Sequence, residues 1–117
     1  MRIAVLTNAY PPEAHGGAGQ IAFLQAEALR AKGHEIRVWQ GSLAWTKRSC
    51  LVRFFYHLRD HIAVHPSTAE IQAWKPDRLL THNLTGVGFR TSAVLQVSGI
   101  PWIHVLHDVQ LFVPSGR

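Results

Sequence analysis

The sequence predicts an α/β fold in which a parallel sheet carries helices on both faces. Short apolar runs alternate with stretches of helical periodicity along the whole chain. A strand, a loop, a helix and a second strand follow one another within about 40 residues, which requires parallel strands joined by a crossover. No repeat or linker interrupts this pattern, and 117 residues suffice for one domain with a core.

The first predicted unit contains two strands and a helix. Residues 2–7 form an apolar strand, and the loop after it carries Pro11, Pro12 and then glycines. The core-facing stripe of the following helix is expected to consist of Ile21, Leu24, Ala28 and Leu29. Gly33 is suited to the left-handed C-cap of that helix, and residues 36–39 alternate as the second strand.

The remainder of the chain continues the alternation of helices and strands. After the polar residues 41–50, a helix is expected to carry one apolar face, consisting of Leu51, Phe54, Phe55, Leu58 and Ile62. A short helix is expected to begin after Ser67, and residues 78–82 form a strand. A further helix ends at Gly99 and precedes the last strand, residues 102–106.

Polar residues follow the predicted strands at the points where the strands end. A parallel sheet binds its ligands outside the carboxyl ends of its strands, so these residues are expected to converge on one crevice. They are Thr7 and Asn8 with the glycine loop, Gln40 and Gly41, His82 and Asn83, and His107 and Asp108.

The glycine loop has a weak match to a dinucleotide-binding fingerprint. Gly17 and Gly19 begin a glycine-x-glycine-x-x-alanine match, but ten residues separate Gly17 from Leu6, where the fingerprint needs a tight turn. No acidic residue ends the second strand to hold a ribose. A nicotinamide-dependent enzyme is therefore an alternative, and glycines that let the helix pack closely on the sheet are another. Free backbone N–H groups at the start of that helix favour an anion.

Two histidines near the end of the chain are predicted to differ in role. Alternation along the last strand places His107 on one face with Ile103 and Val105, and His104 on the other. His104 lies mid-strand and is expected to be a structural histidine. His107 lies at the edge of the crevice, where a titratable imidazole can act on a ligand. A structural role for His107, such as capping the next turn, is the alternative.

The charge of the chain is basic and uneven. It contains 12 Lys and Arg against 7 Asp and Glu, and residues 36–59 hold five basic side chains and no acidic one. Such a patch favours phosphate, nucleic acid or an anionic membrane, the alternative being a solvated face. No nucleic-acid-binding motif accompanies it. Residues 47–62 are amphipathic and basic, which indicates either contact with an anionic membrane or packing of the apolar face on the sheet. A non-catalytic adaptor that binds an anionic surface through residues 47–59 is a further functional alternative.

Three histidines at helical spacing raise the question of a metal site. His57 and His61 could ligate a metal from one face of a helix, but no cysteine or carboxylate is spaced to complete the site. Pro66 indicates that the helix has ended by His65. No metal is expected, and a basic, partly exposed helix is the preferred interpretation. Cys50 is the single cysteine, which excludes an internal disulfide and fits a reducing compartment.

An ordered set of short motifs carries a resemblance to a known family. The motifs are residues 2–6, Tyr10-Pro11-Pro12, Gly16-Gly17, residues 29–36, Lys75-Pro76-Asp77, Gly99-Ile100-Pro101 and His107-Asp108. In order and spacing they resemble the N-terminal domain of family 4 (group 1) glycosyltransferases, which are retaining enzymes of the GT-B fold. The resemblance covers most of the chain and is weakest over residues 41–66.

The resemblance implies a Rossmann-like open parallel sheet, the incomplete N-terminal half of a GT-B fold, with residues 1–117 as the acceptor-side domain. It implies transfer of a sugar from a nucleotide-sugar donor, the co-substrate, to a glycan, lipid or small-molecule acceptor, with no required metal or other cofactor. By position, Gly16 and Gly17 would lie near the donor diphosphate or the acceptor. His107 would lie near the transferred sugar as the catalytic residue, and Asn83 would line the acceptor side.

The same resemblance sets expectations for the chain as a whole. The family's donor-binding domain, with its paired glutamates, is absent from these 117 residues. We therefore expect a fragment or a truncated gene product that is inactive alone and lacks its C-terminal domain. Its expected location is cytoplasmic, and the amphipathic, basic residues 47–62, rather than the resemblance, indicate peripheral contact with the inner membrane face.

Overall fold

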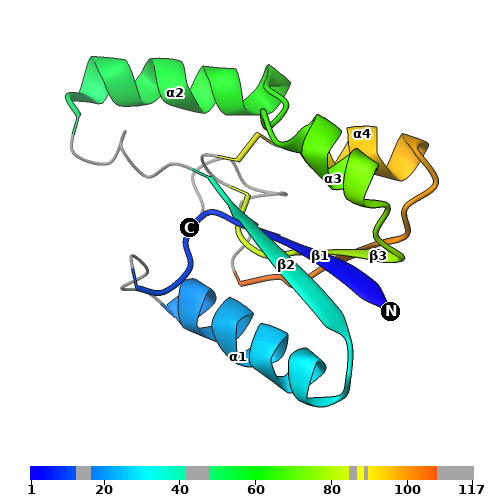
Figure 1. Ribbon diagram of the computed structural model, residues 1–117. Coiled ribbons are helices and arrows are strands. Elements are labelled where there is room, and N and C mark those ends of the chain that lie inside the picture. The colour runs from blue at the N-terminus through cyan, green and yellow to red at the C-terminus, as the bar shows by residue number, and fades with distance from the viewer. Residues whose placement is uncertain (13–16, 42–47, 85–86, 89, 108–117) are drawn as a thin grey trace.

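The computed structural model describes residues 1–12, 17–41, 48–84, 87–88 and 90–107. These residues form a four-stranded parallel sheet with helices on both faces, as the sequence predicts (Figure 1). In chain order the elements are β1 (Arg2–Thr7), α1 (Gly17–Ala31), β2 (Glu35–Gln40), α2 (Cys50–Ile62), α3 (Thr68–Trp74), β3 (Arg78–Thr81), α4 (Arg90–Val97) and β4 (Trp102–His104).

The strand order is β2-β1-β3-β4, and every neighbouring pair is parallel. The chain moves from β1 to β2 on one side and then returns past β1 to β3 on the other side. The direction of winding therefore reverses between β1 and β3, which are the two central strands. In doubly wound sheets this reversal opens a crevice beyond the carboxyl ends of the strands.

α1 covers one face of the sheet (Figure 1), and it packs there through small side chains. The buried residues of α1 are Gly19, Ala22 and Ala26, whereas Ile21 and Leu24 are 41% and 58% exposed. The core-facing stripe predicted for this helix is therefore wrong in most of its members, although Leu29 packs partly against the core. Small residues let the helix backbone approach the strands closely, which agrees with the close-packing interpretation of the glycine at position 19.

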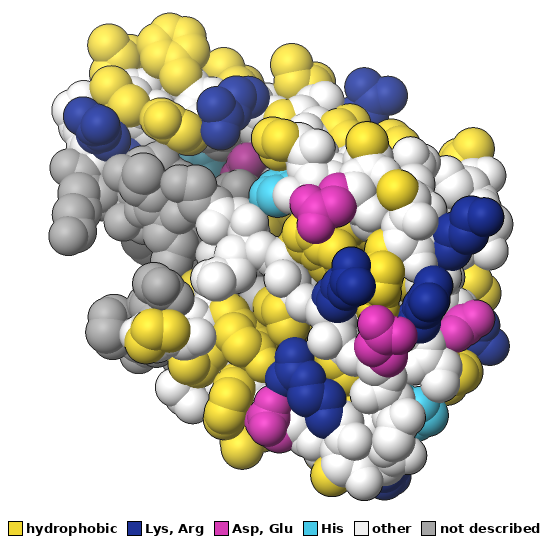
Figure 2. Space-filling model, viewed as in Figure 1, with side chains coloured by type: hydrophobic (Ala, Val, Ile, Leu, Met, Phe, Trp, Pro, Cys, Tyr) yellow, Lys and Arg dark blue, Asp and Glu magenta, His cyan; other side chains and the backbone are white. Residues whose placement is uncertain are grey.

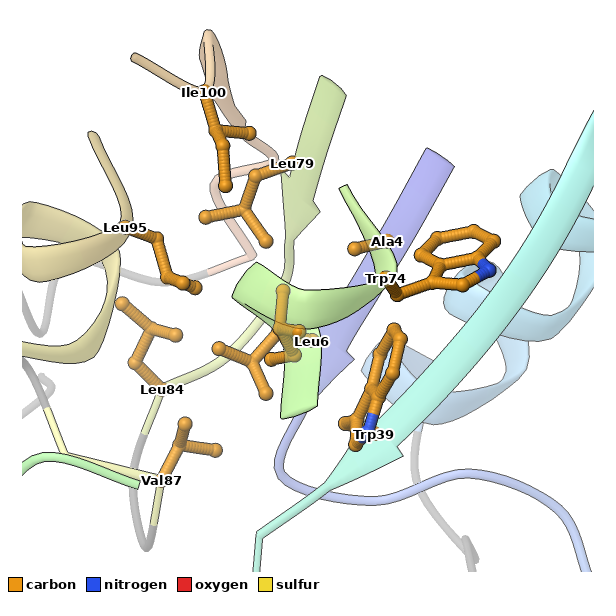
Figure 3. Packing of buried hydrophobic residues seen from close by; sticks show 10 residues of the cluster. Ala4, Leu6, Trp39, Trp74, Leu79, Leu84, Val87, Leu95 and Ile100 are labelled. Carbon is orange, nitrogen blue, oxygen red and sulfur yellow. The ribbon is translucent and has the colours of Figure 1, made fainter. Parts of the chain in front are cut away.

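α3 and α4 cover the other face, where the larger hydrophobic cluster lies (Figure 3). Alternation along β1 directs Ala4 and Leu6 to this cluster and Ile3 and Val5 to the α1 side. The ring centroids of Trp39 and Trp74 lie 5.7 Å apart within it. The cluster consists of Ala4, Leu6, Trp39, Ile71, Trp74, Leu79, Leu84, Val87, Leu95 and Ile100.

The ends of the elements follow local sequence signals. Gly33 after α1 and Gly99 after α4 have φ angles of +88° and +84°, the left-handed conformation predicted for the C-cap of α1. Ser67 is the N-cap residue of α3, although its side chain makes no capping hydrogen bond. β4 stops at His104 rather than at residue 106, because β3, its partner strand among the described residues, has four residues.

α2 directs its large apolar residues away from the sheet. Leu51, Phe54, Phe55, Leu58 and Ile62 are 67%, 57%, 60%, 49% and 69% exposed. The residue of α2 that is buried is Asp60. Packing of the apolar face on the sheet, one of the two alternatives for this segment, is therefore wrong. Within the described residues, the helices are too short or too polar to cross a membrane.

Candidate functional site

Hydrogen bonds join the segments that follow the first three strands at one edge of the sheet. The Asn8 N–H donates to the Asn83 carbonyl at 3.0 Å, and the Gly41 N–H donates to the Thr7 carbonyl at 2.9 Å. Asn8 and Asn83 therefore lie together at the point where the winding reverses. Residues far apart in the sequence are thus brought together at the carboxyl edge of the sheet, as predicted. Asp108, also expected there, lies outside the described residues.

A pair of histidines forms the centre of this edge. A hydrogen bond of 2.9 Å joins His82 Nδ1 and His107 Nε2, and the two rings stack with centroids 5.2 Å apart. His82 is fully buried, and His107 is half-buried. Burial lowers the pKa of His82 to about 4, with further lowering from the nearby charges of His107 and His104. His82 is therefore neutral at pH 7. In this neutral form it is hydrogen-bonded to the His107 ring.

The second ring nitrogen of His82 is an unusual atom. Nε2 is buried, and within the part of the chain that the structure describes it has no hydrogen-bond partner. A neutral imidazole carries one donor and one acceptor nitrogen, and Nδ1 is already used by His107. A buried polar atom without a partner is unfavourable by about 1–3 kcal/mol. Binding of a water molecule or of a polar ligand atom at Nε2 would remove that penalty.

A second hydrogen-bond network supports the histidine pair from the adjacent strand. The Trp102 indole N–H donates to Thr81 Oγ1 at 2.6 Å, and Thr81 Oγ1 is also bonded to His104 Nδ1 at 2.7 Å. Thr81 is fully buried in β3, directly before His82. His104, which is the last residue of β4 rather than mid-strand, is held in this network and so has the structural role expected for it. The network fixes β4 against β3 just before the chain reaches His107.

The other predicted site residues are two glycines before or at the start of α1 and Asn83 beside the histidine pair. Gly16 lies outside the described residues. Gly17 is the exposed first residue of α1, which begins on the side of the sheet where the strands end (Figure 1). A Cβ added at Gly17 would meet no atom within 4 Å among the described residues, so the fold does not require glycine there for space. Asn83 is half-buried next to His82.

A pocket of about 430 Å³ lies beside this edge, between the end of β2 and the end of α2. His65 closes one side, because its Nε2 bonds to the Gln40 carbonyl at 2.9 Å. His65 lies beyond the end of α2 at Ile62, as Pro66 predicts. The lining residues are Gln40, Gly41, Arg59, Asp60, Ala63, Val64, His65, Pro66 and Val87. Among the described residues, no three His, Cys, Asp or Glu side chains are grouped to hold a metal ion.

Two parts of this site go beyond the residues singled out from the sequence. His82 was expected at the crevice as a strand-end residue, but not as the partner of His107. The sequence did contain one signal for this contact. His82 ends the predicted strand 78–82, and this places it at the same edge of the sheet as His107. The pocket has no sequence signal, because it depends on how the end of α2 is placed beside Gln40.

Comparison with known proteins adds no relative. No family model, curated protein or solved structure matches the chain. The function is therefore inferred from the carboxyl edge of the sheet and from the order of the sequence motifs.

Proposed function

We propose that this chain is the acceptor-side domain of a retaining glycosyltransferase of the GT-B fold. In the complete enzyme it would help to move a sugar from a nucleotide-sugar donor to an acceptor. The strand order β2-β1-β3-β4 carries the proposal, because its reversal point coincides with Asn8, Asn83 and the His82–His107 pair. The choice of this particular family rests on the order and spacing of the sequence motifs.

The proposed reaction places two demands on the protein. The bond between the anomeric carbon and the donor diphosphate breaks, and the acceptor oxygen bonds to that carbon and loses its proton. Negative charge develops on the leaving diphosphate while the sugar becomes oxocarbenium-like. Preorganised donors and dipoles aimed at these charges lower the barrier. The nucleotide sugar is a co-substrate, and the proposal requires no metal ion from this chain.

His107 is the proposed catalytic residue. Its ring is oriented by the hydrogen bond from Nε2 to His82 and by stacking on that buried ring. The nitrogen that this bond does not use, Nδ1, can contact the transferred sugar or the leaving group. A ring held by a buried neutral partner keeps its orientation during the reaction, which electrostatic preorganisation requires.

The remaining roles belong to the start of α1 and to the end of β3. The first N–H groups of α1, at Gly17, carry the positive end of a 15-residue helix and suit the donor diphosphate or the acceptor, together with Gly16. Asn83 is proposed to line the acceptor side of the crevice. The donor nucleotide would be held by the second domain of the complete enzyme.

The deciding experiment measures nucleoside diphosphate release from a panel of nucleotide sugars by the complete polypeptide that contains this chain. His107→Ala is expected to lower turnover roughly 100-fold or more while the melting temperature stays close to wild type. His104→Ala, which removes the ring bonded to Thr81 three positions before His107, is the matched control and is expected to affect stability more than turnover. Equal turnover in His107→Ala and wild type would remove His107 from the mechanism.

Gly17→Ala supplies a second, milder test of the same site. The added Cβ meets no described atom within 4 Å, so the fold should be unaffected. A rise in KM for donor or acceptor would then report close approach of a substrate to the start of α1. Saturable NADH binding without diphosphate release from any nucleotide sugar would favour the nicotinamide-dependent alternative and overturn the proposal.

A further inference from the structure

The apolar stripe of α2 points to solvent. We call it the α2 outer face, defined by Leu51, Phe54, Phe55, Leu58 and Ile62, each between 49% and 69% exposed. Figure 2 shows hydrophobic side chains gathered along the edge of the molecule that α2 occupies in Figure 1. Five large apolar side chains on one helix face form a contiguous patch, which monomeric proteins keep for an interaction.

The opposite side of α2 makes the contact with the rest of the chain. At 3.6 residues per turn, Asp60 lies on the far side of the helix from the outer face. Asp60 is 4% exposed and lines the pocket beside Gln40. α2 therefore packs through a polar side, the reverse of an ordinary surface helix. Its apolar face is left available to a partner.

The α2 outer face has a cationic border. Arg48 and Arg59 are exposed beside it, whereas Arg53, seven positions before Asp60, lies on the opposite side of the helix. The Arg59 guanidinium lies over the Tyr56 ring at 4.7 Å, which supports it along the helix. Asp60 is the only acidic residue between positions 36 and 69, and it is buried. The exposed surface of α2 thus combines an apolar strip with positive charge and no negative charge.

We propose that the α2 outer face binds the surface of a membrane that contains anionic lipids. A helix of this kind lies in the plane of the interface, with its apolar side chains among the acyl chains and its arginines at the lipid phosphates. The charge of the face is complementary to such a surface, and the chain as a whole carries a net charge of +5.

A second copy of the chain fits the same face less well. Two α2 helices packed through their outer faces would bring Arg48 and Arg59 of both copies together, and α2 exposes no carboxylate to pair with them. Like charges at such a contact are repulsive. The anionic lipid surface satisfies both the apolar strip and its cationic borders.

This interaction goes beyond glycosyl transfer and does not depend on it. Arg59 belongs both to the border of the outer face and to the lining of the pocket beside Gln40. A chain docked through α2 would therefore hold that pocket next to the lipid headgroups.

Vesicle flotation with the 117-residue chain tests the proposal. The chain should float with vesicles of phosphatidylcholine and phosphatidylglycerol and bind pure phosphatidylcholine at least about tenfold more weakly. Phe54→Gln together with Phe55→Gln should weaken binding to the anionic vesicles by about tenfold or more. Arg48→Gln together with Arg59→Gln should weaken it roughly fivefold for each arginine, and added salt should act in the same direction.

The matched control is Leu24→Gln, an equally exposed apolar residue on α1, at 58% exposure. It should leave binding unchanged. Melting temperatures of all variants should stay near wild type, so that lost binding is not lost folding. Cys50, exposed in the first turn of α2 and the only cysteine, accepts an environment-sensitive fluorophore. Its emission should shift to the blue on anionic vesicles only.

Three outcomes would overturn the proposal. They are no binding to anionic vesicles, binding that the Phe54→Gln and Phe55→Gln variant retains, and equal loss in Leu24→Gln. A concentration-dependent dimer that this double variant makes monomeric, with no vesicle binding, would assign the face to a second copy instead. Each result concerns α2 alone, and the diphosphate-release assay of His107→Ala decides the proposed transferase activity separately.

Discussion

The carboxyl edge of the sheet and α2 depart from ordinary burial in opposite directions. The edge buries polar side chains, with Thr7, Thr81 and His82 all fully inaccessible. α2 exposes apolar ones, with Phe55 60% exposed while Asp60 is buried. Buried polar groups and exposed apolar patches are the informative deviations on a protein surface, since an isolated exposed apolar residue is common.

The two regions differ in how the departure is compensated. At the edge, the Thr7 hydroxyl donates to the Ala9 carbonyl at 3.1 Å, and Thr81 Oγ1 bonds to two side chains. His82 Nε2 is the atom there that the described residues leave unsatisfied. On α2, the exposed apolar strip has no covering element among the described residues. The buried polar groups of the edge are thus mostly satisfied by hydrogen bonds within the chain. The apolar face of α2 can be removed from water only by a binding partner.

The largest expected effect concerns His82 and pH. Its pKa is about 4 in the folded chain, against an ordinary value of 6.5, so the unfolded chain binds more protons between these pH values. The contribution of neutral His82 to the free energy of unfolding is thus fully present above pH 6.5 and is lost as pH falls toward 4. The loss amounts to at most about 3 kcal/mol. Denaturant unfolding of wild type and His82→Asn at pH 7 and near pH 4 measures the difference.

The His82→Asn variant should show a smaller loss of stability over this interval than wild type. His57→Asn, which changes an exposed histidine of α2, is the control and should keep the wild-type loss. A wild-type pH dependence in His82→Asn would mean that the buried ring is not the group responsible, and the contrast between the two regions would weaken.

A smaller effect is expected from the network before His82. Thr81→Val keeps the shape of the side chain but removes the oxygen bonded to Trp102 Nε1 and His104 Nδ1. Leaving these groups without that partner should lower the free energy of unfolding by about 1–3 kcal/mol. A double-mutant cycle with Trp102→Phe, read by denaturant unfolding, should show that the two changes are not additive. Additive losses would show that the hydroxyl and the indole do not interact.

The smallest effect on stability is expected on α2. Phe55→Gln removes an apolar ring that is 60% exposed, so the free energy of unfolding should change by no more than about 0.5 kcal/mol in either direction. Thermal and denaturant unfolding measure it. A loss well above 1 kcal/mol would indicate that the ring packs against the chain and would remove the contrast with the edge.

Local signals in the sequence predicted much of the fold. The apolar run at residues 2–7 became β1 with the same bounds, and Gly33 adopts the left-handed conformation expected at the end of α1. Ser67 precedes α3 as predicted, and Pro66 marks a stretch that is no longer helical. Such signals succeed because strand periodicity, caps and proline act through a few neighbouring residues.

The helix faces were harder to predict than the elements. On α1 the apolar stripe through Ile21 and Leu24 was expected inside, but Gly19, Ala22 and Ala26 are buried instead. Both stripes satisfy helical spacing, and the choice depends on how closely the helix approaches the strands. For α2 the amphipathic pattern was evident, yet its orientation toward solvent depends on where Asp60 is accommodated.

The sequence by itself determined the alternation of strands and helices, the polar residues at the strand ends and the amphipathic character of α2, because these are properties of neighbouring residues. The tertiary structure decided the strand order, the contact of His82 with His107 across 25 positions and the outward direction of the α2 outer face. The physical reason is that each of these depends on non-local packing. Burial of one surface against another selects among faces that local periodicity leaves equivalent.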